Sequence, residues 1–137
     1  MRINYKEMKK LDKKSLEDLY ADVDWSAYTK DLDKLQQSVA NSLYVLTAWQ
    51  EEELIGLIRV VGDGLSIIYI QDLLVKNAYH NQKIGSELIQ SVLHKYADVR
   101  QKVLLTEEAP NTRYFYEKNG FKSCDQGDAI AFARLDF

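Results

Sequence analysis

The chain has 137 residues and a net charge of −3, and it is 46% hydrophobic and 28% charged. This balance is typical of a globular protein, and the length favours a single domain over residues 1–137. No apolar run approaches the ~18 residues of a membrane span, and residues 1–6 lack the apolar core of a signal peptide, so we expect a cytoplasmic protein with no membrane partner. The acidic balance also argues against nucleic acid as a partner. Because Cys124 is the only cysteine and there are two histidines, neither a disulfide nor a metal site is expected.

Apolar spacing in the first half of the chain predicts short helices between strands. The expected elements are a strand over residues 3–8, a helix over 15–22, a loop over 22–28, a helix with Thr29 as its N-cap, and strands over 43–49, 54–61 and 66–75. Gly62-Asp63-Gly64 is a strong turn signal between the last two strands. These strands are apolar on both faces, which indicates a sheet covered by helices on each side.

The second half alternates helices and strands. Residues 85–97 form the clearest helix, because Ile84, Leu88, Ile89 and Val92 lie on one face. The other expected elements are a strand over 102–106, a helix over 112–118 that starts near Pro110 and ends at Gly120, and closing strands over 121–124 and 129–135. The predicted fold class is therefore α/β with a mixed sheet, in the order β-α-α-β-β-β-α-β-α-β-β.

The most informative segment is residues 73–88, Leu-Leu-Val-Lys-Asn-Ala-Tyr-His-Asn-Gln-Lys-Ile-Gly-Ser-Glu-Leu. It is typical of a buried strand, a short polar loop and an amphipathic helix that opens at Ile84-Gly85-Ser86. Such a loop directs several free backbone N–H groups to one point, with the positive end of the helix dipole behind them, and this arrangement favours a phosphate group. The alternative is an ordinary strand-to-helix connection with a glycine near the start of the helix.

A second motif, Phe115-Tyr116-Glu117-Lys118-Asn119-Gly120-Phe121, follows later in the chain. Together the two motifs resemble the GNAT superfamily of N-acetyltransferases, and the order of elements matches that fold over essentially the whole chain. The resemblance implies a mostly antiparallel central sheet, acetyl-CoA as the cofactor, and direct transfer of acetyl to a primary amine of a small molecule or of a peptide or protein. The alternative is a non-catalytic acyl-CoA-binding or regulatory module of the same fold. Many relatives pair through their last strands, so a homodimer is a further expectation, although the sequence leaves the oligomeric state open.

By this resemblance, the diphosphate of the cofactor is held by His80, Asn81, Gln82, Lys83, Ile84, Gly85 and Ser86. The family pattern R/Q-x-x-G-x-G/A, aligned on Gly85, places His80 at the R/Q position and Lys83 at the first glycine, so the chain departs from the pattern twice. If the Lys83 position needs a positive φ, a lysine holds it less easily than a glycine. Alternatively, the Lys83 ammonium adds a positive charge toward the phosphate.

The resemblance assigns the pantetheine arm to the backbone of Leu73, Leu74 and Val75, where a bulge separates this strand from the strand over 102–106. One of these N–H groups then polarises the thioester carbonyl. A plain central strand is the alternative, since no glycine marks a bulge. Asn111 is either a contact of the cofactor arm or the N-cap of the helix that follows it.

Tyr116 is the acid for the departing thiolate in the family motif. The ordinary pKa values of a phenol, ~10, and a thiol, ~8.5, are close enough for this role. Packing alone is the alternative for this tyrosine. The candidate bases that take a proton from the attacking amine are Glu107, Glu108 and Asp72.

The acceptor is expected to meet residues of the loop over 22–28 and of the strands that face it. Trp25 and Tyr28, with carboxylates nearby, form an aromatic pair suited to an ammonium ligand, and alternatively Trp25 anchors the loop to the core. Arg59 and Tyr69 lie on strands that could line the same cavity. Arg59 is unusual in an apolar run, and it pairs with Asp72 or meets a substrate carboxylate.

Overall fold

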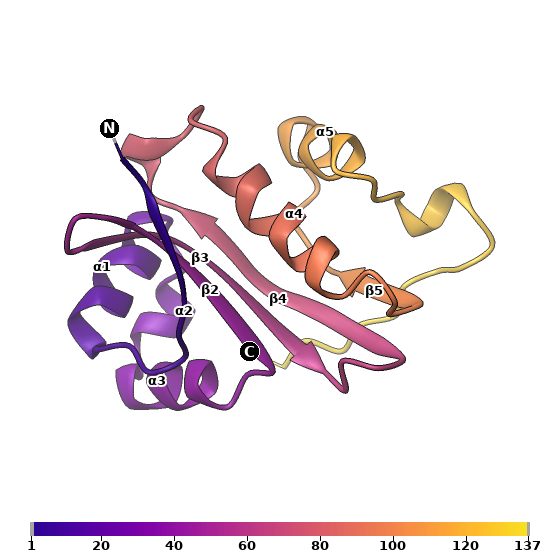
Figure 1. The fold of residues 1–137 in the computed structure, drawn as a ribbon. Helices are drawn as coiled ribbons and strands as arrows, with labels where there is room; N and C mark the ends of the chain where they lie inside the picture. The colour runs from indigo at the N-terminus through magenta and orange to yellow at the C-terminus, as the bar shows by residue number, and fades with distance from the viewer. Residues whose placement is uncertain (1, 137) are drawn as a thin grey trace. The chain divides into compact units, whose positions relative to one another are not determined.

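The computed structural model describes residues 2–136, which form two compact units, one ending at Leu105 and one beginning at Thr106. The first unit is a five-stranded sheet with helices packed on it (Figure 1). Its elements, in chain order, are β1 (Asn4–Glu7), α1 (Lys13–Asp22), α2 (Ser26–Thr29), α3 (Leu32–Ala40), β2 (Tyr44–Gln50), β3 (Glu53–Gly62), β4 (Ile67–Val75), η1 (Asn77–Tyr79), α4 (Ile84–Lys95) and β5 (Gln101–Leu104). The second unit contains α5 (Pro110–Lys118) and the 3₁₀ helix η2 (Cys124–Gln126).

The strands follow chain order across the sheet, β1-β2-β3-β4-β5. Neighbours from β1 to β4 are antiparallel, whereas β5 runs parallel to β4. Helix α4 lies in the crossover that such a parallel pair requires. The predicted α/β class with a mixed, mostly antiparallel sheet is confirmed.

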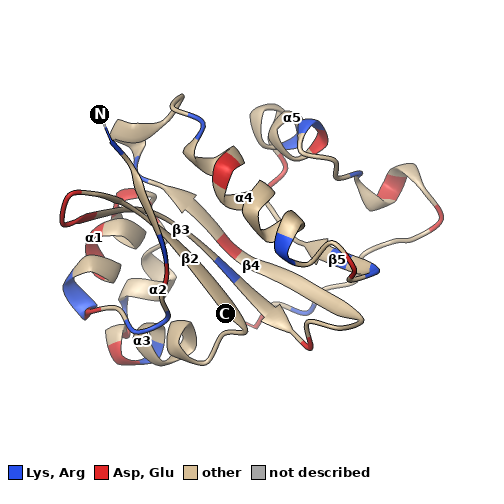
Figure 2. Ribbon diagram, viewed as in Figure 1, with Lys and Arg blue, Asp and Glu red and all other residues tan. Residues whose placement is uncertain are grey.

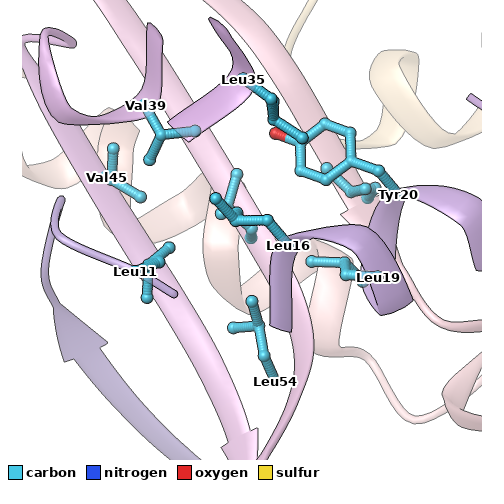
Figure 3. Close-up of a cluster of buried hydrophobic side chains, with 10 residues drawn as sticks. Leu11, Leu16, Leu19, Tyr20, Leu35, Val39, Val45 and Leu54 are labelled. Carbon is cyan, nitrogen blue, oxygen red and sulfur yellow. The ribbon is translucent and has the colours of Figure 1, made fainter. Parts of the chain in front are cut away.

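Helices cover both faces of this sheet. Neighbouring residues of a strand face opposite sides, so a single strand contacts helices on both faces. On one face, Leu57 of β3 belongs to a buried cluster with Tyr20 and with leucines of α1 and α3. Figure 3 shows the cluster, with Tyr20, Leu16, Leu19 and Leu35 among its labelled side chains. On the other face, a side chain added at Gly56 would meet Ile84 and Leu88 of α4 at 3.4 Å. The sheet is therefore enclosed between α1 to α3 on one side and α4 on the other.

Two aspartates begin the helices of the first face. The carboxylates of Asp12 and Asp31 accept hydrogen bonds from first-turn N–H groups of α1 and α3, at 2.8 and 3.1 Å. The N-cap expected at Thr29 is therefore wrong. Thr29 instead ends α2, a short helix in the segment expected to be a loop, and its hydroxyl donates to the Ser26 carbonyl. The acceptor for the first turn of α3 is instead the carboxylate of Asp31, two residues after Thr29.

The strands in the centre of the sheet carry few charges (Figure 2). β2 has none, β3 has Glu53 and Arg59, and β4 has only Asp72. Arg59 and Asp72 lie opposite each other in the ladder and are 6% and 1% exposed. A buried charge is costly unless it is paired and hydrogen-bonded, so these two residues mark a specific feature of the sheet.

The C-terminal unit differs from the expectation after α5. The predicted strands over residues 121–124 and 129–135 are wrong, because within the described residues this segment contains only η2 and irregular backbone. Ile130, Phe132 and Leu135 are exposed there. Apolar, β-prone residues form a strand only when a neighbouring strand pairs with them and one face is buried, and the described part of this unit offers no strand for that pairing.

Helix lengths are short throughout the described chain. The longest, α4, has 12 residues. Within residues 2–136 no helix combines the length and the apolar character needed to cross a membrane. The same residues bring together no group of three or more histidine, cysteine, aspartate or glutamate side chains that could hold a metal ion.

The turn between β3 and β4 matches its sequence signal. Gly62 has a φ of +131° and Gly64 a φ of +74°, both in the region that favours glycine. Between them, the Asp63 carboxylate accepts hydrogen bonds from the Ser66 hydroxyl and from three backbone N–H groups. These bonds, led by the one from the Ser66 hydroxyl, hold the pKa of Asp63 well below its usual range. The turn therefore fixes the register in which β3 and β4 begin to pair.

Replacing Gly62 by alanine is expected to lower the free energy of unfolding by roughly 1–3 kcal/mol, because the residue keeps a positive φ and its new Cβ would lie 2.5 Å from the Ile67 carbonyl oxygen. Urea denaturation measures the change. The matched control is Gly127→Ala, since Gly127 has an extended φ of −140° and no atom within 4 Å of an added Cβ. Equal stabilities for the two variants would contradict this account of the turn.

Candidate functional site

The edge of β4 that faces β5 is only partly paired. The parallel ladder joins Ile67 to Gln101 at one end and Ile70 to Leu104 at the other. β4 continues to Val75, so on that side the backbone from Gln71 to Val75 has no strand partner in the described sheet. This is the segment where the resemblance places the pantetheine arm. An unpaired strand edge is suited to such an arm, because its N–H and C=O groups can bond a bound amide chain as a further strand would.

The hydrogen bonds around Val75 show which backbone groups point to this free edge. The Lys76 N–H donates to the Ile55 carbonyl of β3 at 2.8 Å, so it points away from the edge. Because successive N–H groups of a strand alternate between its two sides, the N–H of Leu74 also points to β3, and those of Leu73 and Val75 point to the free edge. The Val75 carbonyl is already bonded to Nε2 of His80 at 2.8 Å.

A bulge lies where the pairing with β5 ends. Asp72 is opposite Arg59, but Ile70 is opposite the next residue, Val60, so Gln71 is an extra residue on β4. A bulge of this kind bends a strand and re-aims its side chains. The bulge implied by the resemblance is thus present, although no glycine marks it in the sequence.

The loop after β4 has an unusual backbone. Asn81 and Lys83 have φ values of +67° and +64°, and Gln82 lies between them. Lys83 occupies the N-cap position of α4, and its side chain makes no capping hydrogen bond. The first turn of α4, formed by Ile84-Gly85-Ser86, therefore begins without the side-chain acceptor that usually satisfies its N–H groups. The Lys83 position does need a positive φ, which is the condition under which a lysine holds it less easily than glycine.

The beginning of this loop is tied to the rest of the first unit. The Asn77 N–H donates to the Asp22 carboxylate at 2.7 Å, and the Asn77 amide donates to the Asp22 carbonyl at 2.8 Å. Glu53 accepts from Lys76 at 3.0 Å and from the Tyr79 hydroxyl at 3.1 Å. Sequence reasoning missed these two acidic anchors, because Asp22 lies at the start of the segment expected to be a loop and Glu53 lies between two expected strands.

A buried polar network lies beside the bulge. Asp72 Oδ2 accepts from Arg59 Nε at 2.7 Å and from the Tyr20 hydroxyl at 2.9 Å. Asp72 Oδ1 accepts from the Tyr28 hydroxyl at 2.8 Å. The predicted pairing of Arg59 with Asp72 is confirmed. Because both oxygens of this buried carboxylate are occupied, the geometry disfavours Asp72 as the base for an amine.

The tyrosines of this network act as donors. Burial, with the Asp72 charge as the next cause, raises the pKa of both Tyr20 and Tyr28. Each phenol therefore stays protonated, and its O–H donates a hydrogen bond to Asp72. Helical spacing gives no signal of the contact between Tyr20 and Asp72, because Asp72 lies 52 residues further along the chain.

Trp25 and Tyr28 lie together, as the sequence predicts. Their rings are 6.0 Å apart, and Tyr20 completes the cluster at 6.0 Å from Trp25 and 5.1 Å from Tyr28. Trp25 is partly buried against the core cluster of α1 and α3, which favours the anchoring interpretation for this residue. Tyr69 lies opposite Val61 in the ladder, on the same sheet face as Arg59 and Asp72.

The residues of the second motif lie in the C-terminal unit. The Tyr116 ring packs against those of Phe115 at 5.1 Å and Phe121 at 5.9 Å. Burial raises the pKa of Tyr116 to about 12. Gly120, with a φ of +93°, follows the end of α5 as predicted.

The start of α5 corrects one expectation. Pro110 is its first residue and Ala109 its N-cap, so the N-cap interpretation of Asn111 is wrong: Asn111 lies inside the first turn. Glu108 accepts two hydrogen bonds from Arg113, at 2.6 and 2.8 Å. This hydrogen bonding lowers the pKa of Glu108. Glu107 accepts a single long bond of 3.4 Å from Thr112. Of the two glutamates, Glu107 is thus the less engaged.

Comparisons with known proteins show which family the chain resembles. A family model for the acetyltransferase (GNAT) domain matches residues 10–135. The structure of the GNAT-family acetyltransferase SP0256 from Streptococcus pneumoniae TIGR4 is 30% identical, with a TM-score of 0.87 and 98% coverage of each chain. No curated protein shows a significant match to the sequence.

Two more distant structures share the fold. One is AAC(6')-Iy in complex with the bisubstrate analogue CoA-S-monomethyl-acetylneamine, at 14% identity, a TM-score of 0.68 and 100% coverage of each chain. The other is the aminoglycoside acetyltransferase meta-AAC0020 from an uncultured soil metagenomic sample, in complex with sisomicin, at 16% identity, a TM-score of 0.68, and coverage of 98% of this chain and 97% of that one. The family model spans nearly the whole chain, and the pneumococcal relative is similar over both chains. The chain therefore belongs to the GNAT family of acetyltransferases and is an acyltransferase by that membership.

Proposed function

We propose that this protein transfers an acetyl group from acetyl-CoA to a primary amine of a small molecule or of a peptide or protein. The observation that carries the proposal is the free edge of β4 from Gln71 to Val75, which the chain follows with the uncapped start of α4. The edge offers N–H groups for an amide chain, and the start of α4 offers N–H groups and a positive dipole end for a diphosphate. Acetyl-CoA has both groups and would supply the acetyl as a thioester.

Each part of the site has a proposed task. The N–H groups of residues 81–86, with the ammonium of Lys83, hold the diphosphate. The edge-facing N–H groups of Leu73 and Val75 bond the pantetheine arm, and one of them donates to the carbonyl oxygen on which negative charge develops. Glu107 is the candidate acceptor of the amine proton. A primary amine is the acceptor that the resemblance to N-acetyltransferases implies, and the aminoglycoside acetyltransferase in complex with sisomicin shares the fold.

Tyr116 is proposed to hold a proton for the departing sulfur. A pKa of about 12 keeps the phenol protonated at any physiological pH. Transfer of that proton to a thiolate with an ordinary pKa of ~8.5 is uphill, so the phenol stabilises the sulfur mainly as a hydrogen-bond donor. Because the group is active in its protonated form and its pKa is raised, ionisation of Tyr116 should not lower the rate until pH ~11 or above.

Replacing Tyr116 by phenylalanine is expected to lower kcat on the order of 10²-fold, with little change in acetyl-CoA affinity, because only the donor is lost. Release of the CoA thiol with a panel of primary amines measures the rate. Tyr114→Phe is the matched control, since Tyr114 lies on the same helix and is 66% exposed. Equal rates for the two variants would contradict the role of Tyr116. Binding of acetyl-CoA with no turnover by the wild type on any amine would favour a binding module of the same fold.

Replacing Lys83 by glycine is expected to have opposite effects on stability and binding. Relief of the left-handed backbone, ~1–2 kcal/mol, exceeds the entropic cost of glycine, ~0.5–1 kcal/mol, so urea denaturation should show a gain of roughly 0.5–1 kcal/mol. Calorimetry should show acetyl-CoA affinity lowered about threefold to tenfold by loss of the ammonium, and the loss should shrink at high salt.

The control for this variant is Asn81→Gly, because Asn81 has a similar positive φ without the charge. Asparagine tolerates a positive φ, so this change should leave both stability and affinity nearly unaltered. Wild-type affinity in Lys83→Gly would show that the lysine contributes no phosphate contact.

A further inference from the structure

We propose that Arg59, Asp72, Tyr20 and Tyr28 form a register lock, a buried network that holds the bulge of β4 in place and thereby positions the free edge of that strand. The role of that edge in binding an acyl-CoA rests on the function proposed above, but the lock itself is a property of the fold. Tyr28 and Asp72 are positioning residues in this account. They act on the backbone beyond the bulge and do not themselves touch the reacting atoms.

The bulge changes the face on which β4 presents its side chains. Before it, Ile70 lies opposite Val60, and beyond it Asp72 lies opposite Arg59. Residues directly opposite in a ladder share a face, and neighbouring residues of β3 face opposite sides, so Ile70 and Asp72 are on different faces although they are two residues apart. A regular strand would keep them on the same face.

Without the extra residue in β4, the residues beyond Ile70 would have other partners on β3. If the pairing of Ile70 with Val60 continued regularly, Gln71 would be opposite Arg59 and Asp72 opposite Ile58. Asp72 would then face the side of the sheet that α4 covers with apolar residues, and its carboxylate would lose all its present donors. A slip of one residue in a ladder moves every following side chain to the other face, so the buried carboxylate penalises that slip strongly.

The donors to Asp72 come from three different elements. Arg59 belongs to β3, Tyr20 to α1 and Tyr28 to α2. Arg59 also reaches the Ser42 hydroxyl at 3.3 Å, close to the end of α3. The network therefore joins the bulge to the whole helical layer on that face of the sheet.

Tyr28 contacts both residues of the bulge. Its hydroxyl donates to Asp72 and accepts from Nε2 of Gln71 at 3.0 Å. Consecutive side chains of a regular strand point to opposite faces and cannot meet one hydroxyl, whereas those of a bulge can. The Tyr28 hydroxyl is thus a contact that exists only in the bulged register.

The charges in this network cancel, because the Arg59 guanidinium pairs with the Asp72 carboxylate. The network accordingly has no net charge to attract a cationic acceptor. The absence of a net charge favours a positioning role for Tyr28 over the direct contact with the acceptor that the sequence predicts. A direct contact would appear in the KM for the amine, and a positioning role in kcat.

The test is Tyr28→Phe, with Tyr44→Phe as the matched control, since the Tyr44 hydroxyl donates to the Glu7 carboxylate at 3.1 Å elsewhere in the same sheet. Amide hydrogen exchange followed by NMR is the first readout. In Tyr28→Phe we expect the amides of residues 70–73 to exchange about tenfold faster or more, the effect of losing one hydrogen bond to a charged group. In Tyr44→Phe these amides should be unchanged.

The second readout is kinetic. We expect kcat of Tyr28→Phe to fall about tenfold or more while the KM for the amine changes less than threefold. If Tyr28→Phe fails to fold, Gln71→Met serves instead, because Gln71 is exposed and the change removes one bond to the Tyr28 hydroxyl. Unaltered exchange of residues 70–73 in the folded variant would overturn the register lock. Faster exchange in a protein whose wild type transfers no acetyl group would uphold the lock and refute the proposed function.

Discussion

The carboxylate of Asp72 imposes the constraint on which the rest of the structure depends. It is 1% exposed, so it needs charged and polar donors on every side, and it finds them only where β3, α1 and α2 meet. A buried ion pair contributes little net stability compared with apolar packing, but removal of one partner leaves an unpaired charge. The pair is therefore better understood as a device that selects one arrangement than as a source of stability. Here the selected arrangement is a strand with one extra residue.

The bulge lies where the short β5 stops pairing, and beyond this point β4 keeps an unpaired edge. β4 pairs with β3 along its length and with β5 only up to Ile70, so its last residues keep one free edge. The loop that follows is held at its start by Asp22 and Glu53 and then adopts two left-handed residues before α4. Strain of this kind persists only where surrounding structure fixes it. A rigid edge followed by an uncapped helix start is a pre-organised surface for a long ligand with amides at one end and phosphates at the other.

Much of this fold could be predicted from the sequence, and the exceptions have physical causes. Helix α4 and the Gly62 turn are local features, since periodicity and glycine positions determine them. The Arg59–Asp72 pair was also predictable, because charges in apolar strands need partners. The bulge at Gln71 was implied by the family resemblance alone, because no residue of β4 marks it, and the helical donors around Asp72 come from segments far away in the chain. The prediction of closing strands was wrong because β propensity over residues 129–135 does not indicate whether a partner strand is available. The roles of the site residues stay predictions from the sequence, and the fold gives the strand, loop or helix on which each residue lies.

The most direct test of the central claim is calorimetric titration of acetyl-CoA into the wild type, Gly85→Glu and Gly85→Gln. A glutamate in the first turn of α4 favours the helix itself, so the variant should stay folded, but its charge should repel a diphosphate. The account predicts saturable binding by the wild type, a smaller loss with glutamine, and at least a further tenfold loss with glutamate, because only glutamate adds charge. No binding by folded wild type, or equal affinities for the glutamate and glutamine variants, would contradict it.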